Sequence, residues 1–114
     1  MDIQPSLCNV EDTLCIINGK WKAIIVLHLL YGGTKRFSEL RRLVPSITPK
    51  VLTSQLRELE EQDIIQRVVY PEIPPRVEYS VTEYGLSLKH VLFMLHQWGT
   101  GHLDHMENKA NDKI

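Results

Sequence analysis

The sequence predicts a single, mainly helical domain that carries one small β-hairpin between its fourth helix and its last. Three observations lead to this fold class: apolar residues recur at helical spacing in five segments, two runs of β-branched and aromatic residues flank a proline-rich loop, and no repeat or linker divides the 114 residues. We therefore expect one domain over residues 1–114, with flexible ends at residues 1–7 and from residue 107 onward. Four helices, two strands and a final helix are the order of a helix-turn-helix with a wing.

The first two helices are predicted from their end signals and their apolar content. Asn9 is a suitable N-cap because its side chain can accept a backbone hydrogen bond, and Gly19 ends that helix because glycine tolerates left-handed backbone. Residues 21–31 are too apolar for a one-sided surface helix, so we expect the second helix to be the central, buried one, with Trp21 in the core. Gly33 and the glycine before it end this helix.

A helix-turn-helix is predicted next. A short helix over residues 37–44 presents one apolar stripe and ends at Pro45, since proline disfavours helix in the residue before it. Thr48 followed by Pro49 marks the start of a fourth helix that runs to about residue 62. Its apolar face carries Leu52, Leu56 and Leu59. The opposite face and its flank are polar and carry mainly hydroxyl and basic side chains, with Lys50, Thr53, Ser54, Arg57 and Glu61.

The wing is predicted from two short runs with strand composition. Residues 65–70 and 77–81 are rich in β-branched and aromatic side chains, and the loop between them holds three prolines, which predicts a stiff hairpin tip. Thr82 is expected to cap a long last helix that begins at Glu83. The glycines at positions 99 and 101 lie where this helix could kink or end.

Charge is unevenly distributed along the chain. The formal net charge of −1 argues by itself against a nucleic-acid partner, but residues 35–57 hold six basic side chains against one acid. A local basic field matters more for phosphate binding than the global sum does. Combined with a helix that fits the major groove and a wing beside it, this field predicts a surface for duplex DNA. The candidate contacts are Lys35, Arg36, Arg41, Arg42, Thr48, Lys50, Thr53, Ser54, Arg57 and Arg76.

Alternatives stay open for several of these residues. Arg41 and Arg42 are placed along the phosphate backbone, but an ordinary surface role is about as well supported for each. Arg76 suits the minor groove, whose negative potential attracts arginine, or else it pairs with Glu72 or Glu78. The rival function is a winged-helix adaptor for another protein, which would need an acidic or apolar face in place of the basic one.

The last helix carries more apolar surface than a domain of this size can cover. A two-fold contact between the first and last helices of two copies would bury the surplus. The candidates for this homodimer contact are Leu14, Leu88, Leu92, Leu95 and Trp98. Two recognition helices related by such an axis would meet the half-sites of an inverted repeat.

Other classes of function find no support in the sequence. No run of about 18 apolar residues and no signal peptide is present, so we expect a cytoplasmic protein without a membrane partner. No activated nucleophile, phosphate-cradling loop or pair of carboxylates points to an enzyme. His96, His102 and His105 would not share one face of a helix, and neither a metal nor another cofactor is expected.

Five segments of the chain also carry a family resemblance. They are residues 19–22 (GKWK), 36–41 (RFSELR), 52–59 (LTSQLREL), 70–79 (YPEIPPRVEY) and 81–85 (VTEYG). Over roughly residues 8–99 the chain resembles the HxlR-type family of bacterial winged helix-turn-helix regulators. The resemblance implies a homodimeric, DNA-binding transcriptional regulator. Several members sense oxidants or electrophiles through a cysteine ahead of the first helix, which here is Cys8.

Two opposing effects act on Cys8. The positive end of the first helix favours its thiolate, whereas Glu11 and Asp12 disfavour it. The resemblance favours a reactive thiol, and a constitutive regulator without a thiol switch is the alternative. Cys15 is expected to be buried as a small apolar residue. If both cysteines lie on one helix, about 10 Å of helical rise separates them, which is too far for a disulfide within one chain.

Overall fold

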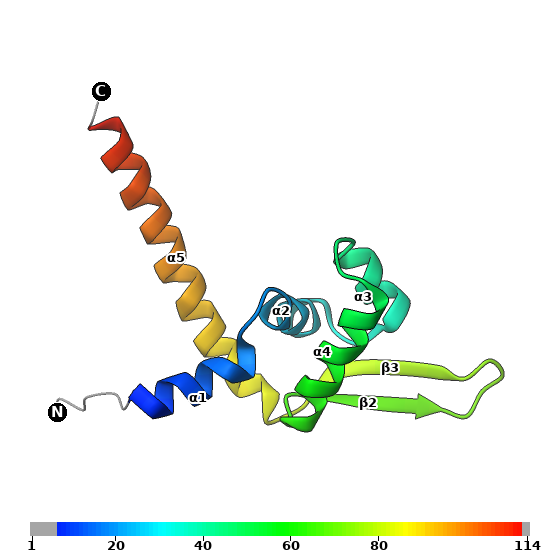
Figure 1. The fold of residues 1–114 in the computed structure, drawn as a ribbon. Helices are drawn as coiled ribbons and strands as arrows, with labels where there is room; N and C mark the ends of the chain where they lie inside the picture. Colours follow the sequence, from blue (N-terminus) through cyan, green and yellow to red (C-terminus); the bar gives the residue numbers. More distant parts are fainter. Residues whose placement is uncertain (1–6, 113–114) are drawn as a thin grey trace.

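The computed structural model describes residues 7–112, with side chains from residue 9 onward, and shows a mainly helical chain with a three-stranded sheet (Figure 1). In chain order the elements are α1 (Leu7–Ile17), α2 (Lys22–Gly32), β1 (Lys35–Arg36), α3 (Phe37–Leu43), α4 (Pro49–Glu61), β2 (Ile65–Tyr70), β3 (Arg76–Val81) and α5 (Leu88–Asn111). A 3₁₀ turn, Gly85–Ser87, leads into α5. This is the predicted winged helix-turn-helix order.

A body formed by α2, α3, α4 and the sheet surrounds the hydrophobic core. The predicted inner face of α4 is confirmed, because Leu52, Leu56 and Leu59 are all buried there. The central position predicted for α2 is also confirmed by the burial of Ile25, Val26 and Leu29. Trp21 packs partly buried against the same core. The core therefore holds α4 with its leucines inward and its polar face outward.

The ends of α2 and α4 are fixed by the residues expected to fix them. The Thr48 hydroxyl accepts a hydrogen bond from the backbone N–H of Val51 at 3.2 Å, and Pro49 occupies the first turn of α4. Gly33 follows α2 with a φ of 78°, a conformation that L side chains rarely adopt. The ammonium of Lys22 in α2 pairs with the Glu58 carboxylate in α4 at 2.8 Å. These interactions fix α4 in position on the body.

The sheet contains one strand that the sequence did not predict. Its order is β1-β3-β2, and both pairings are antiparallel. The two residues of β1 pair with the middle of β3, where Lys35 lies opposite Tyr79. A two-residue strand has no sequence periodicity of its own, because it forms only where β3 offers a free edge. The hairpin of β2 and β3 extends beyond the body as the wing (Figure 1).

The connection between β3 and α5 corrects the predicted helix start. The Thr82 hydroxyl does cap a turn, since it accepts the N–H of Gly85 at 2.8 Å, but that turn is 3₁₀ and α5 begins at Leu88. The backbone N–H of Thr82 donates to the carbonyl of Ile64 at 3.0 Å. A Cβ atom on Gly85 would lie 2.1 Å from that carbonyl oxygen, so only glycine fits this close approach. The base of α5 is thereby joined tightly to the start of β2.

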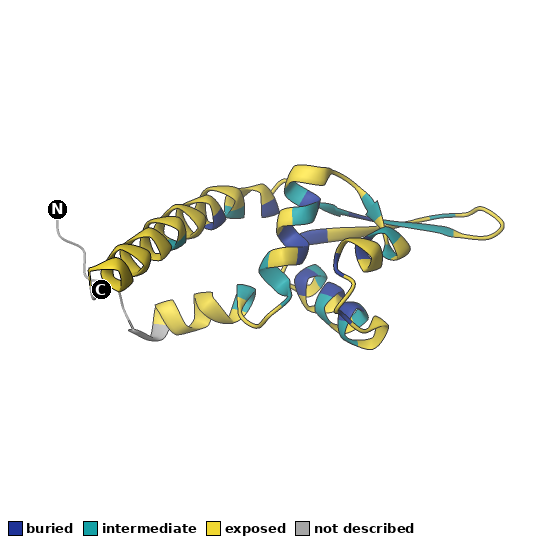
Figure 2. Cartoon of the chain, turned by 90° about the horizontal axis from the view of Figure 1, so that it is seen from above, coloured by how far each residue is buried: buried dark blue, intermediate teal, exposed yellow. Residues whose placement is uncertain are grey.

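The two terminal helices project from the body on the side opposite the hairpin tip (Figure 2). α1 begins at Leu7, so Asn9 lies inside the helix and is not its N-cap. α5 passes through both of its glycines and stays helical to Asn111, beyond position 107 where a flexible tail was expected to begin. Most of the described residues on both helices are exposed (Figure 2). These helices thus lie largely outside the core that the chain builds for itself.

Among the described residues, no single helix is long and apolar enough to cross a membrane, and only α1 and α2 taken together, with a bend of 65° between them, meet the length and composition required.

Candidate nucleic-acid interface

The outward face of α4 is the central feature of the candidate interface. Lys50, Ser54 and Arg57 are exposed on it, and Thr53 is partly exposed at its flank. Within the described chain, neither Lys50 nor Arg57 forms an ion pair. The Thr53 hydroxyl donates to the carbonyl of Pro49 at 2.8 Å and keeps its lone pairs free. The face therefore presents two uncompensated cations and two hydroxyls at spacings suited to a groove of DNA.

The basic residues around α3 divide into two groups. Arg41 and Arg42 are exposed, as contacts to a phosphate backbone would require. The backbone N–H of Arg36 donates to the Glu39 carboxylate at 2.9 Å and so helps to start α3. Lys35 is less available, because its ammonium donates to the carbonyl of Gly32 at 2.8 Å, at the C-terminal end of α2.

In the wing, Arg76 pairs with the two glutamates that the sequence offers as the alternative to a minor-groove contact. Its guanidinium pairs with Glu72 at 3.2 Å and with Glu78 at 3.8 Å. It also lies over the ring of Tyr70, 4.1 Å from the ring centroid, and its Nε is buried without a hydrogen bond. Arg76 thus braces the wing in the free protein. Ile73, at the tip, is fully exposed.

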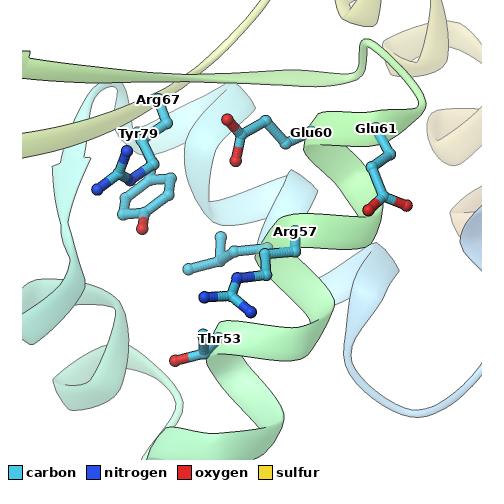
Figure 3. Close-up of a pocket in the computed structure, with 7 residues that line it drawn as sticks. Thr53, Arg57, Glu60, Glu61, Arg67 and Tyr79 are labelled. Carbon is cyan, nitrogen blue, oxygen red and sulfur yellow. The ribbon is translucent and has the colours of Figure 1, made fainter.

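A hollow of about 640 Å³ lies between α4 and the sheet. Its lining combines α4 side chains with two residues of the wing strands, and we call it the α4–sheet hollow: Thr53, Leu56, Arg57, Glu60, Glu61, Arg67 and Tyr79 (Figure 3). Arg67 and Tyr79 lie opposite each other in the β2–β3 register, so their side chains share one face of the hairpin. The sequence analysis missed both residues, because only the strand register shows that they face α4.

The candidate dimer residues fall into two classes. Leu92 is 4% exposed and belongs to the core of the chain itself, and Leu88 packs against that core. Leu92 is thus largely covered within one chain, whereas Leu88 stays partly exposed, and a role of either residue in a dimer contact stays a prediction. Leu14, Leu95 and Trp98 are exposed, and so are further apolar residues on the same two helices: Val10, Val91, Phe93, Met94, Leu103 and Met106. The ring of Trp98 stacks on His102 with centroids 5.0 Å apart.

Both cysteines belong to the first helix, α1. The side chain of Cys8 lies outside the described residues, although its backbone is part of α1. Cys15 is a free thiol and is exposed, so the expectation that it is buried is wrong for the single chain. Both cysteines lie on α1, where about 10 Å of rise would separate them. Across the described residues, no group of three or more histidine, cysteine or carboxylate side chains is arranged to hold a metal ion.

Comparisons with known proteins agree with this architecture. The family model described as HxlR-like helix-turn-helix matches residues 16–107. The HTH-type transcriptional regulator YtcD of Bacillus subtilis is 49% identical over 115 aligned residues, which cover 93% of this chain and 90% of that relative.

Two solved structures extend the comparison to three dimensions. The redox regulator HypR in its reduced form superposes with a TM-score of 0.81 at 48% identity, covering 88% of this chain and 98% of that one. The reduced transcriptional regulator YodB from B. subtilis superposes with a TM-score of 0.73 at 34% identity, covering 82% and 91%. Fold, family match and relatives agree: the chain belongs to the HxlR-like helix-turn-helix family and is an HTH-type transcriptional regulator, not an enzyme.

Proposed function

We propose that this regulator binds a specific DNA operator as a homodimer, with α4 as the recognition helix in the major groove. The observation that carries the proposal is the outward face of α4, where Lys50, Ser54 and Arg57 are exposed and both cations are without ion pairs in the described chain. The opposite face of α4 is held in the core by buried leucines, so this basic face is presented rigidly. Arg41 and Arg42 of α3 then contact the phosphate backbone.

Exposed apolar side chains on α1 and α5 support the homodimer. Leu95 is 52% exposed, Trp98 is 71% exposed and Leu103 is 70% exposed, all on α5, while Leu14 is exposed on α1. Several large exposed apolar side chains on two neighbouring elements are typical of a protein–protein contact. A two-fold contact between these helices in two copies would bury it and relate the two α4 helices by the same axis. The operator is then an inverted repeat whose half-sites lie about one helical turn, or a multiple of it, apart.

The experiment that tests this proposal selects binding sequences from a random DNA library with the purified protein. We expect an inverted repeat to be enriched. Arg57→Ala or Lys50→Ala should weaken binding to that repeat by about 1–3 kcal/mol if the residue contacts a base. A library without an enriched sequence, or two variants that bind as tightly as the wild type, would contradict the proposal.

The adaptor alternative receives less support from the same face. A winged-helix domain that docks on another protein would present an acidic or apolar face, whereas α4 presents Lys50 and Arg57. DNA also explains why the basic residues lie on both α3 and α4, since the phosphates of one groove run past both helices. We place the protein in the cytoplasm, where its operator is.

A thiol switch at Cys8 is the finer part of the proposal. It rests on the similarity to HypR, which is described as a redox regulator, and on the presence of a cysteine in the first turn of α1. Because α1 belongs to the proposed dimer contact, oxidation there would change the spacing of the two α4 helices. The oxidised product is a bridge between subunits or a mixed disulfide, since Cys8 and Cys15 are too far apart on one helix.

Diamide treatment tests the switch. The operator affinity of the wild type should change after diamide, and that of Cys8→Ser should not. Cys15→Ser, which removes the exposed thiol on the same helix, identifies the product: it should keep the response if Cys8 forms a mixed disulfide or a bridge to the other Cys8, and lose it if Cys8 bridges to Cys15 of the other subunit. If the wild type keeps its affinity while mass spectrometry shows Cys8 modified, the protein is a constitutive regulator.

A further inference from the structure

The α4–sheet hollow is lined by a tyrosine whose ring is part of the core and whose hydroxyl is open to the hollow. Tyr79 is only 9% exposed, and its ring is part of the hydrophobic core. Its hydroxyl forms no hydrogen bond with any described residue, although it lines the hollow. This hydroxyl is not among the described buried polar atoms that lack a partner, so it is accessible from the hollow and can donate a hydrogen bond to a ligand. A ligand with an acceptor oxygen suits this position.

Two guanidinium groups line the same hollow without carboxylate partners. Arg57 comes from α4 and Arg67 from β2, and neither forms an ion pair within the described part of the chain. Figure 3 shows the guanidinium of Arg57 and the hydroxyl of Tyr79 pointing into the space between the helix and the sheet. The hydroxyl of Thr53 lies one helical turn before Arg57, on the same side of α4 (Figure 3). The two cations and the Tyr79 hydroxyl are donors of the kind that an oxyanion requires, whereas the Thr53 hydroxyl already donates its hydrogen to the carbonyl of Pro49.

We propose that the α4–sheet hollow binds one phosphate of the DNA backbone, with Tyr79 as a hydrogen-bond donor and Arg57 and Arg67 as its cations. The inference rests on the proposed function, because α4 and the wing strands line the hollow, and a recognition helix in the major groove lies beside the phosphate backbone. It adds two contacts, Arg67 and Tyr79, and assigns them to sequence-independent positioning. Arg57 would then bridge from the groove to the backbone.

Two acidic residues of the lining oppose this phosphate and sharpen the test. In Figure 3 the carboxylate of Glu61 lies on the outer side of α4, away from Tyr79, while that of Glu60 lies on the side of the sheet. Glu60 is the closer of the two to the path of the phosphate and disfavours its binding by like-charge repulsion. Removing this charge should tighten DNA binding, whereas removing the Tyr79 hydroxyl should weaken it. Opposite signs from two side chains of one hollow would not arise from general loss of structure.

The experiment measures binding of the full-length protein to a random-sequence duplex by fluorescence anisotropy over a salt series, because a phosphate contact does not depend on base sequence. Tyr79→Phe should weaken binding about fivefold without changing the melting temperature. Arg67→Gln should reduce the slope of log affinity against log salt by about one. Glu60→Gln should tighten binding about threefold at low salt. The matched controls are Tyr84→Phe and Lys109→Gln, which change an exposed tyrosine and an exposed lysine outside the hollow.

The outcomes separate this inference from the proposed function. If Tyr79→Phe and Arg67→Gln bind DNA like the wild type while Arg57→Ala does not, the function stands and the hollow is no phosphate site. If the wild type itself binds no duplex, the proposed function has failed. The remaining measurement is binding of inorganic phosphate at constant ionic strength to the wild type and to Tyr79→Phe. If it binds the wild type but not Tyr79→Phe, and DNA affinity is the same in both, the hollow takes a free anion and the DNA assignment is overturned.

Discussion

The body and the two terminal helices use apolar residues in opposite ways. In the body, Leu52, Leu56 and Leu59 of α4 are buried against α2 and the sheet within one chain. On the outer part of α5, Leu95, Trp98 and Leu103 are exposed although the helix is regular through Asn111. A helix that covers no core of its own has little stability from packing. The body therefore has a core within a single chain, whereas the terminal helices are the part that we propose a second chain covers.

The largest expected difference between the regions is in unfolding. Leu56→Ala should lower the free energy of unfolding by about 2–5 kcal/mol at every protein concentration, because it leaves a cavity in the body. Leu95→Ala, its counterpart on α5, should lower stability mainly through weaker association, so that its effect depends on protein concentration. Denaturant titrations at two concentrations measure both. A Leu95→Ala effect as large as that of Leu56→Ala and independent of concentration would contradict the division.

The next largest effect is expected on formation of the proposed dimer. Leu95→Glu should give a monomer in sedimentation at micromolar concentration, because it puts a charge into the proposed dimer contact. Its affinity for a two-half-site operator should fall about a hundredfold or more, since each half-site is then bound separately. Val69→Glu is the control for the sedimentation result alone, because Val69 is similarly exposed but lies on β2, in the wing and away from α1 and α5. A dimer that survives Leu95→Glu, or a monomeric wild type, would remove the proposed contact.

A smaller effect is expected from the cap of α4. Thr48→Ala removes the hydroxyl that accepts from Val51 and should cost about 1 kcal/mol of stability. Thr100→Ala on α5 makes no such change and should be neutral within about 0.5 kcal/mol. Thermal melts of both variants give the answer. Equal melting temperatures for the two would mean that the cap contributes nothing to holding α4 on the body.

The smallest effect belongs to the wing brace. Arg76→Gln breaks the pairs with Glu72 and Glu78, which are partly exposed, and should change the free energy of unfolding by at most about 1 kcal/mol. Because Arg76 already has partners in the free protein, its loss should weaken DNA binding less than Arg57→Ala does. Anisotropy with the same duplex compares the two. A larger loss for Arg76→Gln would assign the arginine to the minor groove.

The sequence predicts what depends on local chemistry and misses what depends on pairing. Thr48 and Pro49 mark the start of α4 because a cap acts within one turn, and the leucine spacing identifies its buried face. Arg67 and Tyr79 were missed because only the β2–β3 register places them opposite each other, facing α4. β1 was missed because two residues pair only where β3 offers an edge.

The start of α5 and the burial of its residues also depend on contacts between distant segments, which the sequence does not show. The late start of α5 follows from the 3₁₀ turn that Thr82 and Gly85 form against the carbonyl of Ile64, a contact between distant segments. Leu92 and Leu95 are the same residue type on one helix, so the sequence alone does not distinguish them. Leu92 is buried and Leu95 is exposed because of how α5 packs on α2. Periodicity predicts an apolar side chain and does not identify which chain covers it.

The tight join at Gly85 has a mechanical consequence. Because a side chain cannot be fitted between Gly85 and Ile64, the base of α5 cannot swivel freely on the sheet that carries the wing. The 24 residues of α5 extend about 36 Å from this anchor. The helix therefore acts as a stiff lever, and a small rotation where two such levers meet in the proposed dimer becomes a displacement of whole bodies relative to the DNA. A change confined to the contact between two α5 helices would alter the distance between the two α4 helices without any change inside either body.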